Sequence, residues 1–126
     1  MARYDAPVLR RLAPLFDLAG VVAFVAIGRS QHHHGDAWRG LVSTTWPFAL
    51  GLALAWLVTI RRSRHGLSLG DGALIDVITV ALAMVARVLA GQGTAAAFIV
   101  VALAFLGLVF EAWRLAIGRR GRSWGA

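Results

Sequence analysis

The sequence predicts an all-α membrane protein, a bundle of four transmembrane helices. Hydrophobic residues make up 59% of the 126 residues and charged residues only 15%, with a mean hydropathy of +0.71. A soluble domain has about half apolar and about a quarter charged residues. Four apolar segments are each long enough to cross a bilayer, which takes roughly 17–25 helical residues. Arginines stand in blocks between these segments, as they do beside membrane spans.

The first predicted span covers approximately residues 12–28 and carries one acid, Asp17. A cleaved signal peptide is the alternative for this segment, because Arg10 and Arg11 precede the apolar run. However, Asp17 interrupts the run, no good small-x-small cleavage pattern precedes a soluble domain, and further apolar segments follow. We therefore expect a retained first span. The second span, approximately residues 41–60, contains no charged residue.

The third span, approximately residues 73–90, contains Asp76 and Arg87, and the fourth, approximately residues 94–117, contains Glu111 and Arg114 near its end. The connection between them, GQG at residues 91–93, is so short that spans three and four are expected to form an antiparallel hairpin. Gly93 is expected to need a backbone conformation that other residues do not adopt. Residues 1–126 are thus expected to form a single membrane domain.

The arginines also predict an orientation, because cytoplasmic flanks are enriched in Lys and Arg. Ten of the 13 basic residues, all of them Arg, fall in the N-terminal region, the second loop and the C-terminal region, and three fall on the other side. Both termini are therefore expected in the cytoplasm of a multi-pass protein of the bacterial plasma membrane. The ten are Arg3, Arg10, Arg11, Arg61, Arg62, Arg64, Arg114, Arg119, Arg120 and Arg122, and the three are Arg29, Arg39 and Arg87.

Several functional classes are disfavoured. The chain has no cysteine, which rules out disulfides, thiolate metal sites and cysteine nucleophiles. It contains no G-x-S-x-G, H-E-x-x-H or P-loop motif, so we expect no enzyme. The net charge of +7 is confined to the blocks between apolar runs, which leaves no basic surface stripe for nucleic acid.

The ionisable residues inside the spans are the candidate site residues. Buried charged groups in a membrane mark a site or a pathway, and they also occur as structural pairs. The set consists of Asp17, Arg29, Asp76, Arg87, Glu111 and Arg114. Arg87 lies on the same helical face as Asp76, and it could reach the outer surface or bond a carbonyl in residues 91–93.

Each acid has a structural interpretation beside the functional one. Arg114 is expected to snorkel to the interface and pair with Glu111 at the i, i+3 spacing. Asp76 could cap the third helix, where a negative charge is favourable. Asp17 is too short to snorkel and too deep to cap, so it needs a buried partner such as Arg114 or a donor from a neighbouring helix.

The outer loop contains three consecutive histidines. His32 and His34 could point together in an extended loop with Asp36 as a third ligand, but the spacing is irregular for a metal site. We expect a solvated loop, with no bound metal and no cofactor. The tryptophans are expected to form belts at the membrane surfaces, with Trp56 toward the cytoplasmic end of the second span; the flanking residues are Trp38, Trp46, Trp113 and Trp124.

An ordered set of motifs resembles the DUF3054 family of small bacterial membrane proteins, frequent in actinobacteria and of unknown function. The motifs are FDLAGVVAFVAIGR followed by His, TTWPFALGLALAW, an Arg late in the third span, GQGTAAAFIVVA and a final WR. The resemblance covers roughly residues 12–116 and implies four spans without an assigned chemistry. The matching positions are Asp17, Gly28, Arg29, one of His32 to His34, Trp46, Pro47, Gly51, Arg87, Gly91, Gly93, Thr94, Trp113 and Arg114.

The leading functional hypothesis is a small transport-type or channel-type protein, with Asp17 and Arg87 as polar elements of the pathway. It would act alone, as a homo-oligomer or in a larger membrane complex, in contact with the lipid bilayer and not with nucleic acid. Small multidrug exporters are a related model, but the arginine asymmetry argues against their dual insertion. An accessory or scaffold subunit is the alternative, and a cofactor-binding or metal-binding protein that uses the histidine loop is the weaker third. Polar groups that are dry and fully paired would favour the scaffold, and a wet cavity at Asp17 would favour transport.

Overall fold

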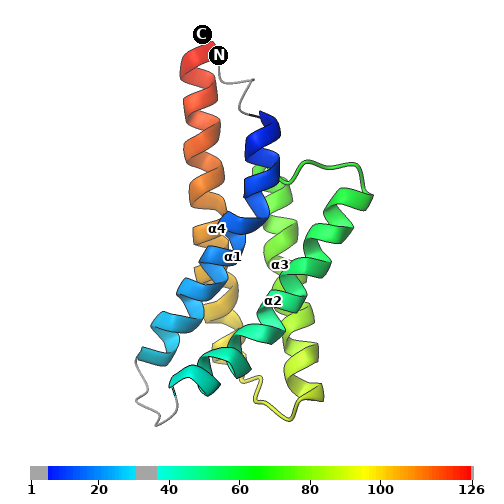
Figure 1. The fold of residues 1–126 in the computed structure, drawn as a ribbon, viewed down its shortest axis with the longest axis vertical. Helices are drawn as coiled ribbons and strands as arrows, with labels where there is room; N and C mark the ends of the chain where they lie inside the picture. The colour runs from blue at the N-terminus through cyan, green and yellow to red at the C-terminus, as the bar shows by residue number, and fades with distance from the viewer. Residues whose placement is uncertain (1–5, 31–36, 126) are drawn as a thin grey trace.

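The computed structural model describes residues 6–30 and 37–125, and within them the side chains of residues 8–28 and 40–118. These residues form four helices and no strand: α1 (Ala6–Ser30), α2 (Ala37–Arg61), α3 (Leu69–Leu89) and α4 (Ala96–Gly125) (Figure 1). Each helix contains a stretch that is long and apolar enough to cross a membrane, namely Val8–Gly28, Gly40–Arg61, Leu69–Leu89 and Ala96–Gly118. The all-α architecture with four candidate spans is confirmed.

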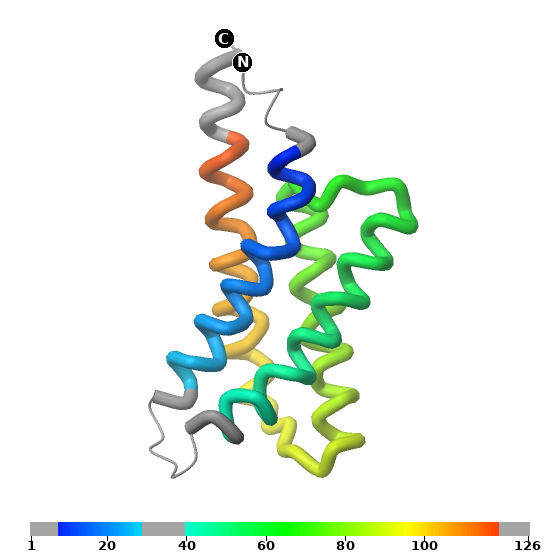
Figure 2. Tube along the Cα trace, viewed as in Figure 1, coloured from blue at the N-terminus to red at the C-terminus, as the bar shows by residue number. Residues whose placement is uncertain are grey.

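The helices pack in a ring, in the order α1, α2, α3, α4 and back to α1. Figures 1 and 2 show the start of α1, the α2–α3 connection and the end of α4 at the same end of the bundle. We call this the terminal end, made of residues 8–12, 62–72 and 111–118, and the other the opposite end.

Both connections that surround α3 are ordered by local hydrogen bonds. Ser68 caps α3, because its Oγ accepts from the Asp71 N–H at 3.0 Å, and the helix begins at Leu69, four residues earlier than expected. At the other end Gly91 takes a φ of +76°, and the tight turn makes α3 and α4 antiparallel neighbours, which confirms the hairpin. The expectation for Gly93 is wrong, because its φ is not positive and a Cβ there would meet nothing within 4 Å. The turn needs glycine at 91 instead, where the chain enters the left-handed region.

The middle of the bundle is packed by aromatic rings and by close helix approaches. The ring of Phe24 lies 5.4 Å from those of Phe48 and Phe105, which joins α1, α2 and α4. A Cβ at Gly51 would come within 2.5 Å of the Thr79 carbonyl oxygen, so α2 and α3 touch through their backbones. Such contacts between small residues are how helices associate in lipid, where no hydrophobic force drives them together.

The outward faces of the helices remain strongly apolar. Leu89, Leu108 and Val100 expose 83%, 73% and 64% of their surface. A soluble monomer rarely leaves so many large apolar side chains in contact with water. A bilayer solvates them well, so the packing supports a multi-pass membrane protein independently of composition.

Candidate functional site

Asp17 lies at the centre of a buried polar network. Its side chain is fully buried in α1, and both carboxylate oxygens accept hydrogen bonds from Arg114, at 2.9 Å for Oδ1 and 2.7 Å for Oδ2. The indole N–H of Trp113 donates to Oδ1 at 2.9 Å, and that of Trp56 donates to Oδ2 at 3.0 Å. The guanidinium binds the carboxylate in the bidentate fork geometry, and the two indoles add one hydrogen bond to each oxygen. The network therefore joins α1, α2 and α4 around one charge.

Arg114 also donates hydrogen bonds to two backbone carbonyls besides those to Asp17. Its Nε donates to the Gly66 carbonyl at 2.8 Å and Nη1 also donates to that of Phe110 at 2.9 Å. The guanidinium stacks on the Trp113 ring, 4.3 Å from the ring centroid, and the Arg114 and Asp17 side chains are both fully buried. The expectation that Arg114 snorkels and pairs with Glu111 is wrong. The guanidinium turns inward because its planar fork donates to both oxygens of the Asp17 carboxylate.

The α2–α3 connection is tied to the same network. Gly66 has a φ of +77°, its N–H donates to Asp71 Oδ2 at 3.0 Å, and its carbonyl accepts from Arg114. Arg64 Nε donates to Asp71 Oδ1 at 2.8 Å. A continuous chain of hydrogen bonds thus runs from Arg64 at the terminal end to Asp17 in the core. Asp71 was missed as a polar centre, although the pattern of Ser68 followed three residues later by an acid is a known helix-start signature.

Asp76 and Glu111 form the second polar site, between α3 and α4. Asp76 is 8% exposed and Glu111 is half-buried, and neither Asp76 Oδ1 nor Glu111 Oε1 makes a hydrogen bond. The two carboxylates interact electrostatically with each other. A buried polar atom without a partner is uncommon and calls for an explanation.

Each of these two acids packs on a glycine of the other helix. A Cβ at Gly107 would lie 2.8 Å from Asp76 Oδ2, and a Cβ at Gly72 would overlap Glu111 Oε1. Gly72 and Asp76 are one turn apart on α3, and Gly107 and Glu111 are one turn apart on α4. The missing side chains make the space that the carboxylates fill.

Asp76 does not cap α3, because the helix starts at Leu69 and Asp76 lies about two turns inside it. The N-cap residue is Ser68, not Asp76. The sequence analysis placed the start of the helix too late, so an interior residue resembled a capping residue.

Arg87 closes the opposite end of the α3–α4 hairpin. Its Nε donates to the Gly93 carbonyl at 2.8 Å, Nη1 donates to Gln92 Oε1 at 3.0 Å, and the guanidinium lies 4.6 Å from the centroid of the Phe98 ring. Gln92 Nε2 in turn donates to the Ser43 carbonyl of α2 at 3.0 Å. Of the two alternatives for Arg87, the bond to a carbonyl of residues 91–93 is therefore the correct one.

The remaining candidate residues fall outside the described side chains. These are Arg29, His32, His34 and Asp36. Among the residues that are described, no group of three or more His, Cys, Asp or Glu side chains is arranged to hold a metal ion.

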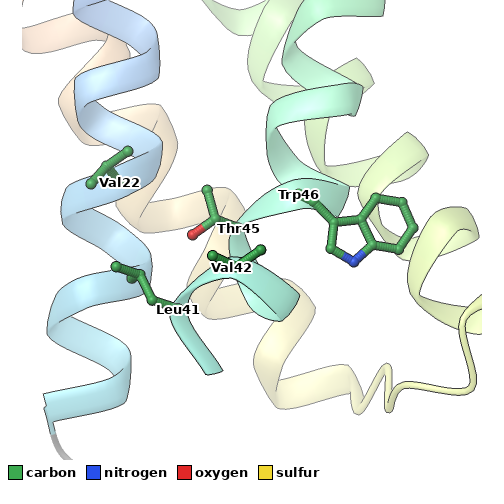
Figure 3. Close-up of a pocket in the computed structure, with 5 residues that line it drawn as sticks. All are labelled: Val22, Leu41, Val42, Thr45 and Trp46. Carbon is green, nitrogen blue, oxygen red and sulfur yellow. The ribbon is translucent and has the colours of Figure 1, made fainter. Parts of the chain in front are cut away.

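An apolar crevice of about 250 Å³ opens between α1 and α2 toward the opposite end (Figure 3). It is lined by Val22, Leu41, Val42, Thr45 and Trp46, and Figure 3 shows Leu41 and Thr45 of α2 facing α1. Thr45 Oγ1 makes no hydrogen bond. Asp17 does not line this crevice, and its side chain is fully buried.

Comparison with known proteins agrees with the resemblance seen in the motifs. The family model described as "Protein of unknown function (DUF3054)" matches residues 15–117. The match covers all of the buried polar residues described above. No curated protein and no solved structure matches the chain.

Proposed function

Since the chain belongs to the DUF3054 family, whose description assigns no activity, we propose its function from its geometry: it is a small transport-type membrane protein. In this proposal Asp76 and Glu111 handle a positively charged species between α3 and α4. The Asp17–Arg114 pair holds the bundle together and does not take part in transport. The protein is a transporter without catalytic chemistry.

A single contrast between the two acidic sites carries the proposal. Asp17 accepts four hydrogen bonds, whereas Asp76 Oδ1 and Glu111 Oε1 accept none. An ionised acid in the middle of a membrane helix costs roughly 2.5–3.5 kcal/mol even on the gentler insertion scale. At Asp17 the hydrogen bonds from Arg114 and from the two indoles offset this cost. No such partner offsets it at Asp76, so a functional role is the better explanation there.

This assignment moves the pathway away from the residues that the sequence favoured. Asp17 and Arg87 were expected to line it, but both are occupied by hydrogen bonds to their neighbours. We therefore assign structural roles to these two residues and the transport role to the acids of the α3–α4 interface.

We further propose that both termini and the α2–α3 connection face the cytoplasm of a bacterial plasma membrane. The support is the distribution of ten Arg against three. Topology reporters at residue 1, in residues 61–65 and after Gly125 should all report a cytoplasmic location. An external location of residues 61–65 would contradict the orientation. In this orientation Glu111, which packs on the first turn of α3, lies toward the cytoplasmic side.

Flux into liposomes tests the proposal. Purified protein is reconstituted into vesicles that contain a pH-sensitive or cation-sensitive dye, and a gradient is imposed. Wild type should give flux well above that of empty vesicles, and Asp76→Asn and Glu111→Gln should each abolish it. Asp71→Asn is the matched control. It removes a carboxylate from the same helix, but that carboxylate already accepts hydrogen bonds from Arg64 and Gly66. Folded wild-type protein without flux for protons or common cations would refute the transport function.

An accessory or scaffold subunit is the second candidate, and the saturated Asp17–Arg114 network favours it. A bundle whose deepest charges are fully paired is built to be rigid. This candidate predicts that the protein co-purifies from native membranes in a fixed ratio with another membrane protein or with further copies of itself. It also predicts that folded protein shows no flux alone, so the same vesicle assay separates the two functions.

A further inference from the structure

We infer that Asp76 and Glu111 share one exchangeable proton, and hence that the species bound between α3 and α4 is a proton. That proton binding is coupled to transport rests on the proposed function. That the two acids share a proton rests on their reciprocal packing and on the groups that surround them.

The packing places two acids in one narrow interhelical space. Asp76 Oδ2 sits against Gly107, and the Glu111 carboxylate sits against Gly72, on helices that run in opposite directions. Two positions on each helix, one turn apart, thus face two positions on the other. Any larger residue at either glycine would displace a carboxylate, so the glycines and the acids form one unit.

The described cation nearest to these acids already has an anionic partner. Arg114, one turn from Glu111 on α4, interacts with Glu111 electrostatically, but its guanidinium is bound to Asp17 of α1 through two hydrogen bonds. On α3 the neighbouring acid Asp71 is bonded to Arg64, and α2 carries no charge between residues 40 and 60. The two acids therefore face each other with the charge of Asp17 already neutralised. Like charges held close together in a poorly polarisable medium do not both ionise, and one of the two keeps its proton.

The number of available oxygens favours a proton over a metal ion. Hard cations such as Ca²⁺ and Mg²⁺ take six or more oxygen ligands. This site offers two carboxylates, and beyond them the hydroxyl of Thr79, which lies one turn further along α3, is fully buried and makes no hydrogen bond. A proton needs only one donor and one acceptor oxygen, so it fits the small set that is present.

The two acids also differ in access. Asp76 is 8% exposed, whereas Glu111 is only half-buried and packs against Gly72 in the first turn of α3, at the terminal end. A proton is therefore expected to enter and leave through Glu111 and to be held deeper, at Asp76. Movement of the proton between them involves no covalent change other than breaking one O–H bond and forming another.

Infrared spectroscopy of the purified protein tests the inference without measuring flux. Wild type in nanodiscs is titrated across neutral pH, and the band of a protonated carboxyl group is followed in H₂O and D₂O. We expect about one protonated carboxyl per chain near neutral pH, lost on alkalisation, and complete loss of the band in the double variant Asp76→Asn/Glu111→Gln. Asp71→Asn should retain the band, as the matched control.

Three results would overturn the inference: no protonated carboxyl in wild type near neutral pH, a band that persists in the double variant, or displacement of the band by added Na⁺ or Ca²⁺ at constant pH. The last would identify a metal cation as the ligand. The band and the flux are independent readouts. A band without flux supports the proton site and refutes the transport function, whereas flux without a band supports transport and refutes the shared proton.

Discussion

Replacing Asp17 by Asn tests how much the buried ion pair stabilises the bundle. The amide has nearly the shape of the carboxylate, so packing is retained, but one negative charge and one acceptor oxygen are lost. The two Nη groups of Arg114 and the indole N–H groups of Trp56 and Trp113 then face a side chain that itself donates through its NH₂ group. The guanidinium is fully buried, so its charge is left without a counter-charge.

The expected magnitude follows from the general cost of breaking a buried pair. Removal of one partner destabilises a protein by about 3–5 kcal/mol, because the other charge is left buried and uncompensated. That is a large share of a typical stability of about 5–15 kcal/mol. Since 1 kcal/mol corresponds to roughly 2–8 °C in a small domain, the melting temperature should fall by on the order of 10 °C or more. Thermal unfolding in detergent, followed by circular dichroism, measures it.

Asp76→Asn is the matched control for this experiment. It makes the same chemical change in another buried acid of the same bundle, but Asp76 Oδ1 has no described hydrogen bond to lose and none of the described ion pairs includes Asp76. We expect the melting temperature of this variant to equal or exceed that of wild type. Two results would refute this reasoning: Asp17→Asn melting within about 1 °C of wild type, or an equal loss of stability in both variants. Either result would mean that pairing with Arg114 does not stabilise the bundle.

The remaining predictions concern the glycines and the arginine that shape the connections, each measured by thermal unfolding in the same detergent. Gly66→Ala should destabilise the protein by more than about 1 kcal/mol, because the residue has a φ of +77° and an indole ring occupies the space of its Cβ; a neutral effect would mean that the loop relaxes freely. Gly93→Ala should be nearly neutral, since its Cβ would meet nothing within 4 Å, and a large loss would restore the sequence-based expectation. Gly51→Leu should cost about 1–3 kcal/mol or more, because its side chain would enter the α3 backbone, and unchanged melting would argue against the close α2–α3 contact. Arg87→Gln should cost about 1–2 kcal/mol through the lost bond to the Gly93 carbonyl and the lost ring contact, and a stability equal to wild type would show that the clamp is dispensable.

The sequence predicted the spans and the hairpin well, because these depend on local signals. Length, apolar content and the short GQG connection each act within a few residues of where they are read. The boundaries were less accurate. The start of α3 was placed about four residues late, and that error alone turned Asp76 from an interior acid into an apparent cap.

The polar contacts were predicted only in part. Arg114 was named as a possible buried partner of Asp17 and a carbonyl of residues 91–93 as a possible partner of Arg87, and the structure confirms both. The i, i+3 spacing of Glu111 and Arg114 is visible in the sequence, so their pairing was favoured. The actual partner of Arg114 lies on another helix, 97 positions away, and was only one of several alternatives. Trp113 was placed in an interfacial belt, yet its indole N–H donates to Asp17. The packing of Asp76 on Gly107 and of Glu111 on Gly72 depends on the register of the hairpin, which composition does not reveal.

The arrangement around Asp17 has a consequence for how the protein is made. The acid is synthesised early, in the first span, whereas three of its four hydrogen bonds come from Trp113 and Arg114 in the last. While the ribosome completes α2 and α3, the carboxylate has only the indole of Trp56 as a described donor. The Asp17–Arg114 pair therefore forms only after residue 114 of α4 has been synthesised. A chain that stops before residue 113 leaves the acid of the first span with one of its four hydrogen-bond donors and without a counter-charge.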